Sequence, residues 1–191
     1  KNILIAKVSQ NRAKIVCAKN KRSVLPNGKS KKYNTLVQIK SYEEAVKYLE
    51  SFIGKIRYRI GPEFLKHHDP LERMRVLLNL LDNPQDKFKS VLVGGTSGKG
   101  STAYLISHIL ETAGYKTGLT ISPHLEKVNE RLQINGREIS DENFTRMVSS
   151  IVRYSELMKK SKVGEPSYFE ILVALAFLYF VKEKVDIAVV E

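Results

Sequence analysis

The chain has 191 residues, of which 42% are hydrophobic, and a net charge of +12, a composition that suits one domain with a sizeable core. Its longest apolar run, residues 171–181, is shorter than the about 20 residues that a membrane-spanning helix needs, which excludes a transmembrane protein. The single cysteine, Cys17, excludes a disulfide scaffold and a multi-cysteine zinc site, and it favours a reducing compartment such as the cytoplasm.

The positive charge is concentrated at the start of the chain. Residues 1–40 contain nine Lys, two Arg and no acidic residue, whereas residues 41–191 contain 21 basic and 20 acidic residues. The first segment has no sustained periodicity and is interrupted at residues 26–28, so we expect a mostly mobile basic extension. A transit peptide and a phosphate-binding arm are the alternatives. The nearly neutral remainder argues against nucleic acid as a partner.

Two helices are predicted ahead of the first strand. Ser41 and Glu44 have the spacing of a capping box, and the apolar residues after them recur at helical intervals to about Lys55. A second helix with one apolar face is predicted to start at residues 69–70 and to end at residues 83–84, where Asn precedes Pro.

A strand, a glycine loop, a helix and a second strand follow. Residues 88–93 are β-branched and apolar, and they run into the loop GGTSGKGS at 94–101. An apolar helical pattern occupies residues 102–113 and is closed by Gly114, after which residues 117–121 form a short strand. These elements predict a βαβ unit with parallel strands and a right-handed crossover.

A hairpin and a helix are predicted next. Residues 131–139 contain Asn-Gly at 135–136, which is the preferred two-residue turn of a hairpin. Ser140 is a candidate N-cap for a helix that extends to about Lys160.

The last predicted elements are a buried helix and a buried strand. Ser167 and Glu170 form a second capping box before the apolar residues 171–181, and residues 185–191 have the pattern of a buried strand. Helices and strands that alternate around a glycine loop predict an α/β, doubly wound, mostly parallel sheet. Because the chain stops at a strand pattern, we expect this domain to continue in the intact protein.

The glycine loop predicts a site for a nucleoside triphosphate. Glycines allow successive backbone N–H groups to surround phosphate oxygens, and the following helix N-terminus and Lys99 add positive charge. The general P-loop pattern has Ser or Thr directly after the lysine, but Gly100 stands there, so Ser101 or Thr102 supplies the hydroxyl. The alternative is a glycine-rich turn that binds no ligand.

The loop resembles the GTNGKGS loop of the folylpolyglutamate synthase and dihydrofolate synthase family, within the Mur ligase superfamily, where glycine after the lysine is normal. Further matching motifs follow the family's order at 48–50, 71–74, 113–118, 122–125, 130–131, 133–136, 168–170 and 189–191. Ser97 replaces the usual Asn, and Ser167 replaces the usual Thr. The resemblance covers residues 41–191, which would form the N-terminal part of a Mur ligase-like ATP-binding domain that lacks its glutamate-ligase C-terminal domain.

This resemblance implies an ATP-dependent ligase that activates a folate or dihydropteroate carboxylate as an acyl phosphate and joins it to L-glutamate, with Mg²⁺ required. Full-length protein would be a monomer, and residues 1–191 alone would be inactive. The implied ATP site is Gly95, Thr96, Ser97, Gly98, Lys99, Gly100, Ser101 and Thr102, with Lys99 catalytic. The implied pterin site is Ser51, Phe52, Ile53, Gly54, Ser167, Tyr168, Phe169 and Glu170, and the implied metal ligands are Ser101, Ser122 and Glu191.

Other interpretations stay open at this point. The protein is alternatively another Mur-superfamily amide ligase, or a non-enzymatic P-loop protein that binds nucleic acid through its basic extension. For single residues, Phe169 is alternatively core, Glu170 the capping partner of Ser167, and Glu191 an ordinary acid at a strand end. His124 either shapes its loop or takes part in the chemistry.

Overall fold

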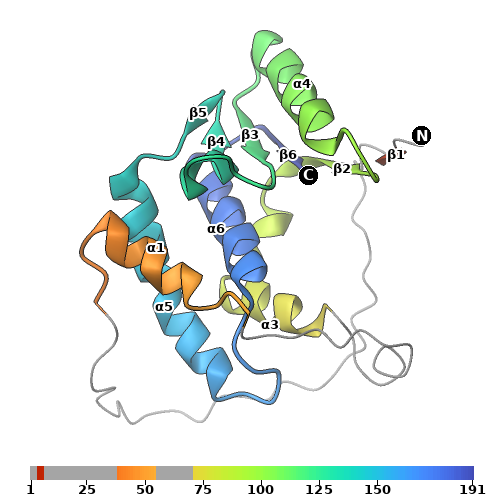
Figure 1. Ribbon diagram of the computed structural model, residues 1–191. Coiled ribbons are helices and arrows are strands. Elements are labelled where there is room, and N and C mark those ends of the chain that lie inside the picture. The colour runs from red at the N-terminus through yellow and green to blue at the C-terminus, as the bar shows by residue number, and fades with distance from the viewer. Residues whose placement is uncertain (1–3, 7–37, 55–70) are drawn as a thin grey trace.

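The computed structural model describes residues 4–6, 38–54 and 71–191, and its strands form one six-stranded sheet in the order β1-β2-β6-β3-β4-β5 (Figure 1). The strands are β1 Leu4–Ala6, β2 Lys89–Gly94, β3 Thr117–Thr120, β4 Gln133–Ile134, β5 Arg137–Glu138 and β6 Ile187–Val190. β6 lies between β2 and β3 and is parallel to both, whereas the other neighbouring pairs are antiparallel.

This order corrects the expectation of a mostly parallel sheet. Only the three central strands are parallel, and the predicted βαβ unit has β6 inserted between its two strands. The strands β4 and β5 are antiparallel because Asn135 and Gly136 adopt positive φ values of 47° and 67°. These values reverse the chain between the two strands, as the predicted hairpin requires. Arg131, which we placed in this hairpin, instead ends a short 3₁₀ helix, η2 Val128–Arg131.

The helices are α1 Tyr42–Glu50, α3 Glu72–Leu80, α4 Lys99–Thr112, α5 Asp141–Lys159 and α6 Tyr168–Lys182, with a second short 3₁₀ helix, η1 Pro84–Asp86. Each predicted helix exists, but some bounds differ. α1 ends before Lys55, because a turn follows Glu50 and Gly54 has φ 74°. α4 starts at Lys99 and not at Thr102, because the left-handed Gly98 precedes it directly. The predicted start of α3 at 69–70 lies outside the described residues.

The capping predictions hold with one difference. Ser167 and Glu170 form the complete capping box at α6, and Ser140 accepts a hydrogen bond from Asn143 N at α5. At α1, Ser41 Oγ accepts from Glu44 N at 3.3 Å, but the Glu44 carboxylate accepts from Lys40 N at 2.7 Å. The box at α1 is therefore displaced by one residue.

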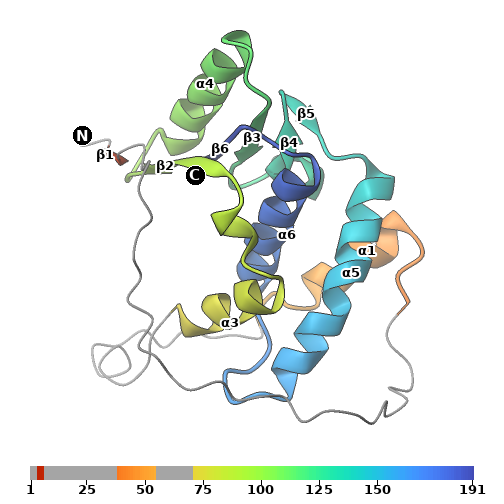
Figure 2. The same cartoon turned by 180° about the vertical axis from the view of Figure 1, so that it is seen from behind.

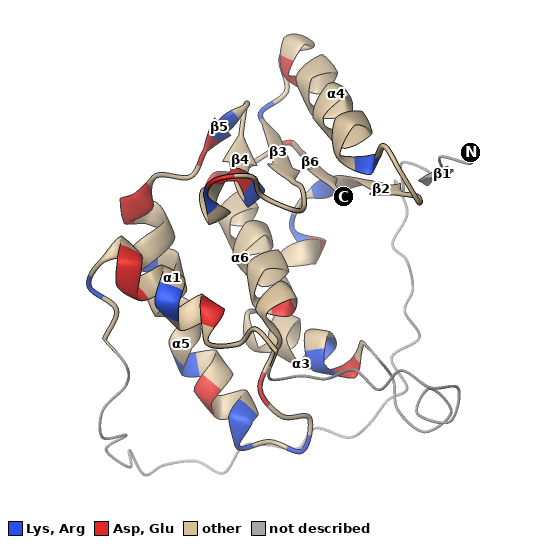
Figure 3. Cartoon of the chain, viewed as in Figure 1, with Lys and Arg blue, Asp and Glu red and all other residues tan. Residues whose placement is uncertain are grey.

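Two segments of the predicted basic extension have a defined place. Leu4–Ala6 is the strand β1, which the sequence did not predict, and it pairs with the end of β2. Ile39 packs against the core, and its carbonyl accepts a hydrogen bond from Ser149 Oγ at 3.0 Å. Ile39 therefore packs with the folded body, although it lies within the segment 1–40 that was expected to be mostly mobile. In the described part of the chain, charges of both signs are interspersed on the helices (Figure 3).

Two apolar clusters cover the two faces of the sheet. α4 packs on one face against Val91, Leu119 and Val189, and α6 lies on the other face, where the larger core is formed (Figures 1 and 2). β6 serves both clusters, because successive side chains of a strand point to opposite faces. None of the described helices is both long and apolar enough to cross a membrane.

This arrangement brings the carboxyl ends of three strands, β2, β6 and β3, to one edge of the sheet. Since β2, β6 and β3 are parallel, the glycine loop, Glu191 and the loop that starts at Ile121 all leave the sheet at its carboxyl edge. Ligands of open α/β sheets bind at this edge.

Candidate functional site

Three of the predicted site residues meet at the carboxyl edge. The Glu191 carboxylate accepts a hydrogen bond from Ser122 N at 2.6 Å, and its other oxygen lies 3.8 Å from Lys99 Nζ. Glu191 N in turn donates to Thr120 O at 3.0 Å, which continues the pairing of β6 with β3 by one residue. The side chain of Glu191 is only 5% exposed, compared with 34% for Lys99. Glu191 is therefore a positioned, buried acid and not a solvated acid at a strand end.

The glycine loop ends in a helix start that is open to solvent. Gly98 adopts φ 74°, a conformation that favours glycine, and no side chain caps the first turn of α4. The N–H groups of that turn are therefore available to an anion, and the helix dipole adds positive charge there. Gly95, Thr96, Ser97, Gly98 and Ser101 are exposed at this end, and Gly100 is half-buried.

Of the two candidate hydroxyls, Ser101 is the free one. Thr102 Oγ1 donates to Gly98 O at 2.8 Å, so that hydroxyl satisfies the helix start. Ser101 is exposed on the same turn. Gly100 faces the acid, since a β-carbon built on it would lie 4.0 Å from the Glu191 carboxylate.

The oxygen ligands at this edge suit a hard cation such as Mg²⁺ only if phosphate oxygens complete its coordination. Among the described residues no group of three or more His, Cys, Asp or Glu side chains is arranged to hold a metal ion. One carboxylate, Glu191, and hydroxyls at Ser101 and Ser122 remain. Mg²⁺ is commonly held by one or two carboxylates plus the phosphates of a nucleotide, so these residues fit a metal ion that arrives with its nucleotide.

The contacts of Glu130, which lies beside the loop that follows β3, were not predicted from the sequence. Its carboxylate accepts hydrogen bonds from Leu125 N, Glu126 N and Lys127 N, each at 2.7 Å. These three hydrogen bonds lower the pKa of Glu130 to about 2, and the bond from Leu125 N has the largest effect. A signal exists in the sequence, because a glutamate three residues after Lys127 has the spacing of an N3 residue that reaches back to an N-cap.

Arg131 connects the same loop to α6. Arg131 Nε donates to His124 Nδ1 at 2.8 Å, and its guanidinium carbon lies 6.0 Å from the centre of the Tyr168 ring. Burial raises the pKa of Tyr168, Arg131 opposes this rise, and the Glu50 carboxylate adds to it. α1 contacts α6, and the charge of Glu50 at the end of α1 acts on Tyr168 at the start of α6, so the two halves of the predicted pterin site lie close together. His124 has a loop-shaping contact.

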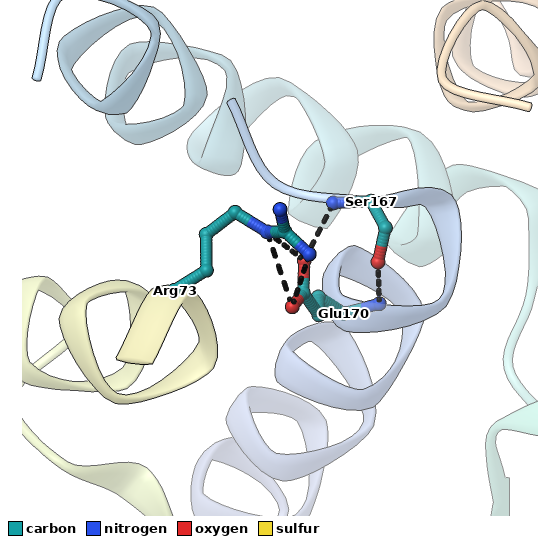
Figure 4. A network of polar contacts seen from close by, with 3 residues as sticks. All are labelled: Arg73, Ser167 and Glu170. Atoms are coloured by element: carbon teal, nitrogen blue, oxygen red, sulfur yellow. Dashed lines mark hydrogen bonds and ion pairs between the residues drawn. The ribbon is translucent and has the colours of Figure 1, made fainter. Parts of the chain in front are cut away.

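Glu170 is committed to contacts within the protein. Arg73 Nε donates to its two carboxylate oxygens at 2.9 and 3.3 Å, Arg73 Nη2 donates at 3.2 Å, and Ser167 N donates at 2.7 Å (Figure 4). Burial alone would raise the pKa of Glu170, but the hydrogen bonds from Arg73 and Ser167 outweigh it and lower the pKa. The interpretation of Glu170 as a capping partner thus describes the structure, and Arg73 is the partner that sequence spacing did not reveal.

The remaining residues of the predicted pterin site differ in how far their side chains are exposed to solvent. Phe52 is 5% exposed and packs edge-on against Tyr48, so its ring belongs to the core. Ser51 Oγ donates to Tyr48 O at 2.6 Å, and Gly54 is exposed with no atom near its β-position. Ile53 and Phe169 are 60% and 56% exposed, so neither is core. Tyr168 is half-buried.

The fold and the site define an α/β domain with a glycine-rich loop and a buried acid at the carboxyl edge of its sheet. No family model matches the chain. It is 36% identical over 152 residues to dihydrofolate synthase/folylpolyglutamate synthase of Bacillus subtilis, a match that covers 79% of this chain and 33% of that protein. The chain thus spans about a third of that relative.

Solved structures agree with this match. Folylpolyglutamate synthase from Thermotoga maritima superposes with a TM-score of 0.67 at 36% identity, over 78% of this chain and 32% of that one. A folylpolyglutamate synthase in complex with AMPPCP and folate gives a TM-score of 0.67 at 34% identity, over 78% and 34% of the two chains. Over this matched stretch the chain belongs to the folylpolyglutamate synthase and dihydrofolate synthase family, which confirms the sequence resemblance.

Proposed function

We propose that the chain forms the nucleotide-binding part of an ATP-dependent ligase that adds L-glutamate to a folate or to dihydropteroate, within a P-loop, Mur ligase-like domain. One observation carries this proposal. The open N-terminus of α4, Lys99 and the buried Glu191 meet at one edge of the sheet. A folylpolyglutamate synthase of similar fold binds AMPPCP and folate, which supports assigning this edge to ATP.

The phosphates of ATP are assigned to the glycine loop. Backbone N–H groups at residues 95–101 and the first turn of α4 bind the phosphate oxygens, and Lys99 places its ammonium on the outer phosphates. In the reaction a carboxylate oxygen of the pteroate bonds to the γ-phosphorus, and the bond from that phosphorus to the bridging oxygen breaks, so ADP leaves. Lys99 neutralises negative charge that moves toward the leaving oxygens.

Glu191, Ser101 and Ser122 would hold Mg²⁺ beside these phosphates, where the ion supplies additional positive charge. The amino group of L-glutamate then bonds to the acyl carbon of the acyl phosphate. Phosphate leaves with the electron pair of its C–O bond, and the amine loses a proton, so the product is an amide.

The pteroate is assigned to the region where α1 ends and α6 begins. Ile53 and Phe169 expose apolar surface there, and an exposed aromatic ring stacks well on a flat heteroaromatic ring. Tyr168 and Arg131 border this region with a polar edge.

An isotope-transfer experiment on the protein encoded by the complete gene tests the proposal. Dihydropteroate and folate, each labelled with ¹⁸O in the carboxylate, are incubated with ATP, Mg²⁺ and L-glutamate. An acyl-phosphate route transfers one ¹⁸O atom to inorganic phosphate for each amide formed. Cell-wall nucleotide-peptide precursors serve as competing substrates. Glutamate addition without ¹⁸O in phosphate would refute the acyl phosphate, and turnover of the precursors alone would assign the chain to another amide ligase.

A further inference from the structure

The loop of residues 121–127 packs at its start, where Ile121 contacts the apolar cluster beneath α4, and beyond that point it is held by hydrogen bonds. It contains no regular structure, and Leu125 at its centre is 91% exposed. Its far end is fixed by Glu130, whose two carboxylate oxygens accept three successive backbone N–H groups, from Leu125, Glu126 and Lys127. Hydrogen bonds to an ionised acceptor are about twice as strong as neutral ones, so this carboxylate is a strong constraint on the far end of the loop.

The near end of the same loop is part of the candidate site. Ser122 N donates to Glu191 at 2.6 Å, and this amide is the partner that turns the Glu191 carboxylate so that its second oxygen faces Lys99 at 3.8 Å. A second tether, from Arg131 to His124, lies between the two ends. The Ser122 amide thus lies between the end of β3, with the packed Ile121, and a loop segment that Glu130 and Arg131 hold by hydrogen bonds.

We propose that Glu130 is a positioning residue: through the backbone of the 121–127 loop it holds Ser122 N against the Glu191 carboxylate and so orients that carboxylate for the nucleotide-bound state. The use of this orientation rests on the proposed function, but the coupling between Glu130 and Ser122 does not. Glu130 acts through the loop, since its two carboxylate oxygens are occupied by the backbone of residues 125–127.

Three variants separate the effect of the position of the Glu130 carboxylate from the effect of its charge. Glu130→Gln keeps the size of the side chain but removes its charge and one acceptor oxygen. Glu130→Asp keeps the charge but retracts the carboxylate by one methylene, so it no longer reaches the three amides. Glu126→Gln is the matched control, because it removes the same charge from the exposed loop that Glu130 holds, while its backbone N–H remains bonded to Glu130.

Two measurements are made on each variant. Amide hydrogen exchange by NMR reports on Ser122 and residues 125–127, with β6 and α6 amides as reporters of the fold. Calorimetric titration with AMPPCP and Mg²⁺ reports on the nucleotide site. Both Glu130 variants should exchange faster at Ser122 and at 125–127 by about tenfold or more and should weaken AMPPCP binding, whereas Glu126→Gln should match wild type.

Each outcome bears on the proposal. Unchanged exchange at Ser122 in the two Glu130 variants would overturn the coupling, and faster exchange with unchanged AMPPCP affinity would overturn its role in the site. Wild-type exchange and affinity in Glu130→Asp would show that charge and not position matters. If wild-type chain does not bind AMPPCP, the proposed function fails, and exchange at Ser122 alone decides the coupling. A variant that loses β6 and α6 protection is replaced by the other Glu130 variant.

Discussion

Lys99 and Glu191, which lie far apart in the sequence, face each other at 3.8 Å between ammonium and carboxylate. Lys99 is the first residue of α4, and Glu191 directly follows β6, so the pair forms only when β6 lies beside β2. A phosphate group that approaches the glycine loop competes with Glu191 for this lysine. The contact is thus a resting arrangement that nucleotide binding is expected to change.

The first prediction concerns Lys99. Lys99→Ala should weaken AMPPCP binding by about tenfold or more, because a charged hydrogen-bond partner of the outer phosphates is lost. The fold should be kept, since the side chain is one-third exposed. Calorimetric titration measures the affinity, and Lys89→Ala is the control, because Lys89 is an exposed residue at the opposite end of β2. Wild-type affinity in Lys99→Ala would remove the central claim of the nucleotide site.

The second prediction tests the metal ligands. Glu191→Gln keeps the shape of the side chain but removes the charge that Mg²⁺ needs, so the Mg²⁺ concentration required for tight AMPPCP binding should rise steeply. Ser122→Ala should have a milder effect, because it removes a neutral hydroxyl and leaves the Ser122 N–H bond to Glu191 intact. Affinity measured against Mg²⁺ concentration separates the two. An identical curve for Glu191→Gln and wild type would exclude Glu191 and leave the hydroxyls of Ser101 and Ser122 as the remaining candidate ligands.

Local signals predicted most of the secondary structure. The capping box at Ser167, the hairpin turn at Asn135 and the glycine loop each depend on residues close together in sequence, and each is present. Strand order depends on contacts between distant segments, which is why the insertion of β6 and the mixed sheet were not predicted. The pairing of β1 belongs to the same class, because a three-residue strand has almost no pattern of its own.

In the candidate site, too, residues in local motifs were predicted and contacts between distant segments were not. Lys99, Ser122 and Glu191 could be named from motifs, and the structure brings them together. For Glu130 the sequence offers only its spacing from Lys127, because its hydrogen-bond partners are backbone N–H groups that any residue types at 125–127 would supply. The partner of Glu170 is Arg73, a residue far away in sequence, so spacing could not show that this carboxylate was already engaged.

The third prediction concerns the close approach of β3 and α6. A β-carbon added at Gly118 would lie 2.6 Å from a ring carbon of Phe180, so Gly118→Ala should cost about 1–3 kcal/mol of unfolding free energy through overpacking. Gly94→Ala in β2 is the matched control, because nothing lies within 4 Å of its β-position. Urea unfolding measures both. In a Phe180→Leu background the cost of Gly118→Ala should fall, and an unchanged cost would contradict the packing argument.

The fourth prediction concerns the Arg73–Glu170 pair. Their side chains are 17% and 8% exposed, so Arg73→Met leaves a largely buried carboxylate without its main partner and should destabilise the fold by about 3 kcal/mol. The double variant Arg73→Met/Glu170→Leu should recover part of this loss, because no buried charge remains. Urea unfolding of both single variants and the double variant gives the coupling energy. Additive effects would show that the pair contributes little beyond the Ser167 cap.

The last prediction follows from the lowered pKa of Glu170, whose ordinary value is 4.5. Because the pKa is lower in the folded state, the stabilisation is fully present above about pH 4.5 and is lost as pH falls through the folded-state pKa. The free energy of unfolding of wild type should therefore exceed that of Glu170→Gln near neutral pH, and the difference should shrink below about pH 4.5. An Arg73→Met background should reduce this pH dependence, since the Arg73 hydrogen bonds help to lower the pKa. Urea unfolding across this pH range measures the difference, and a constant difference would show that Glu170 is not held ionised by these contacts.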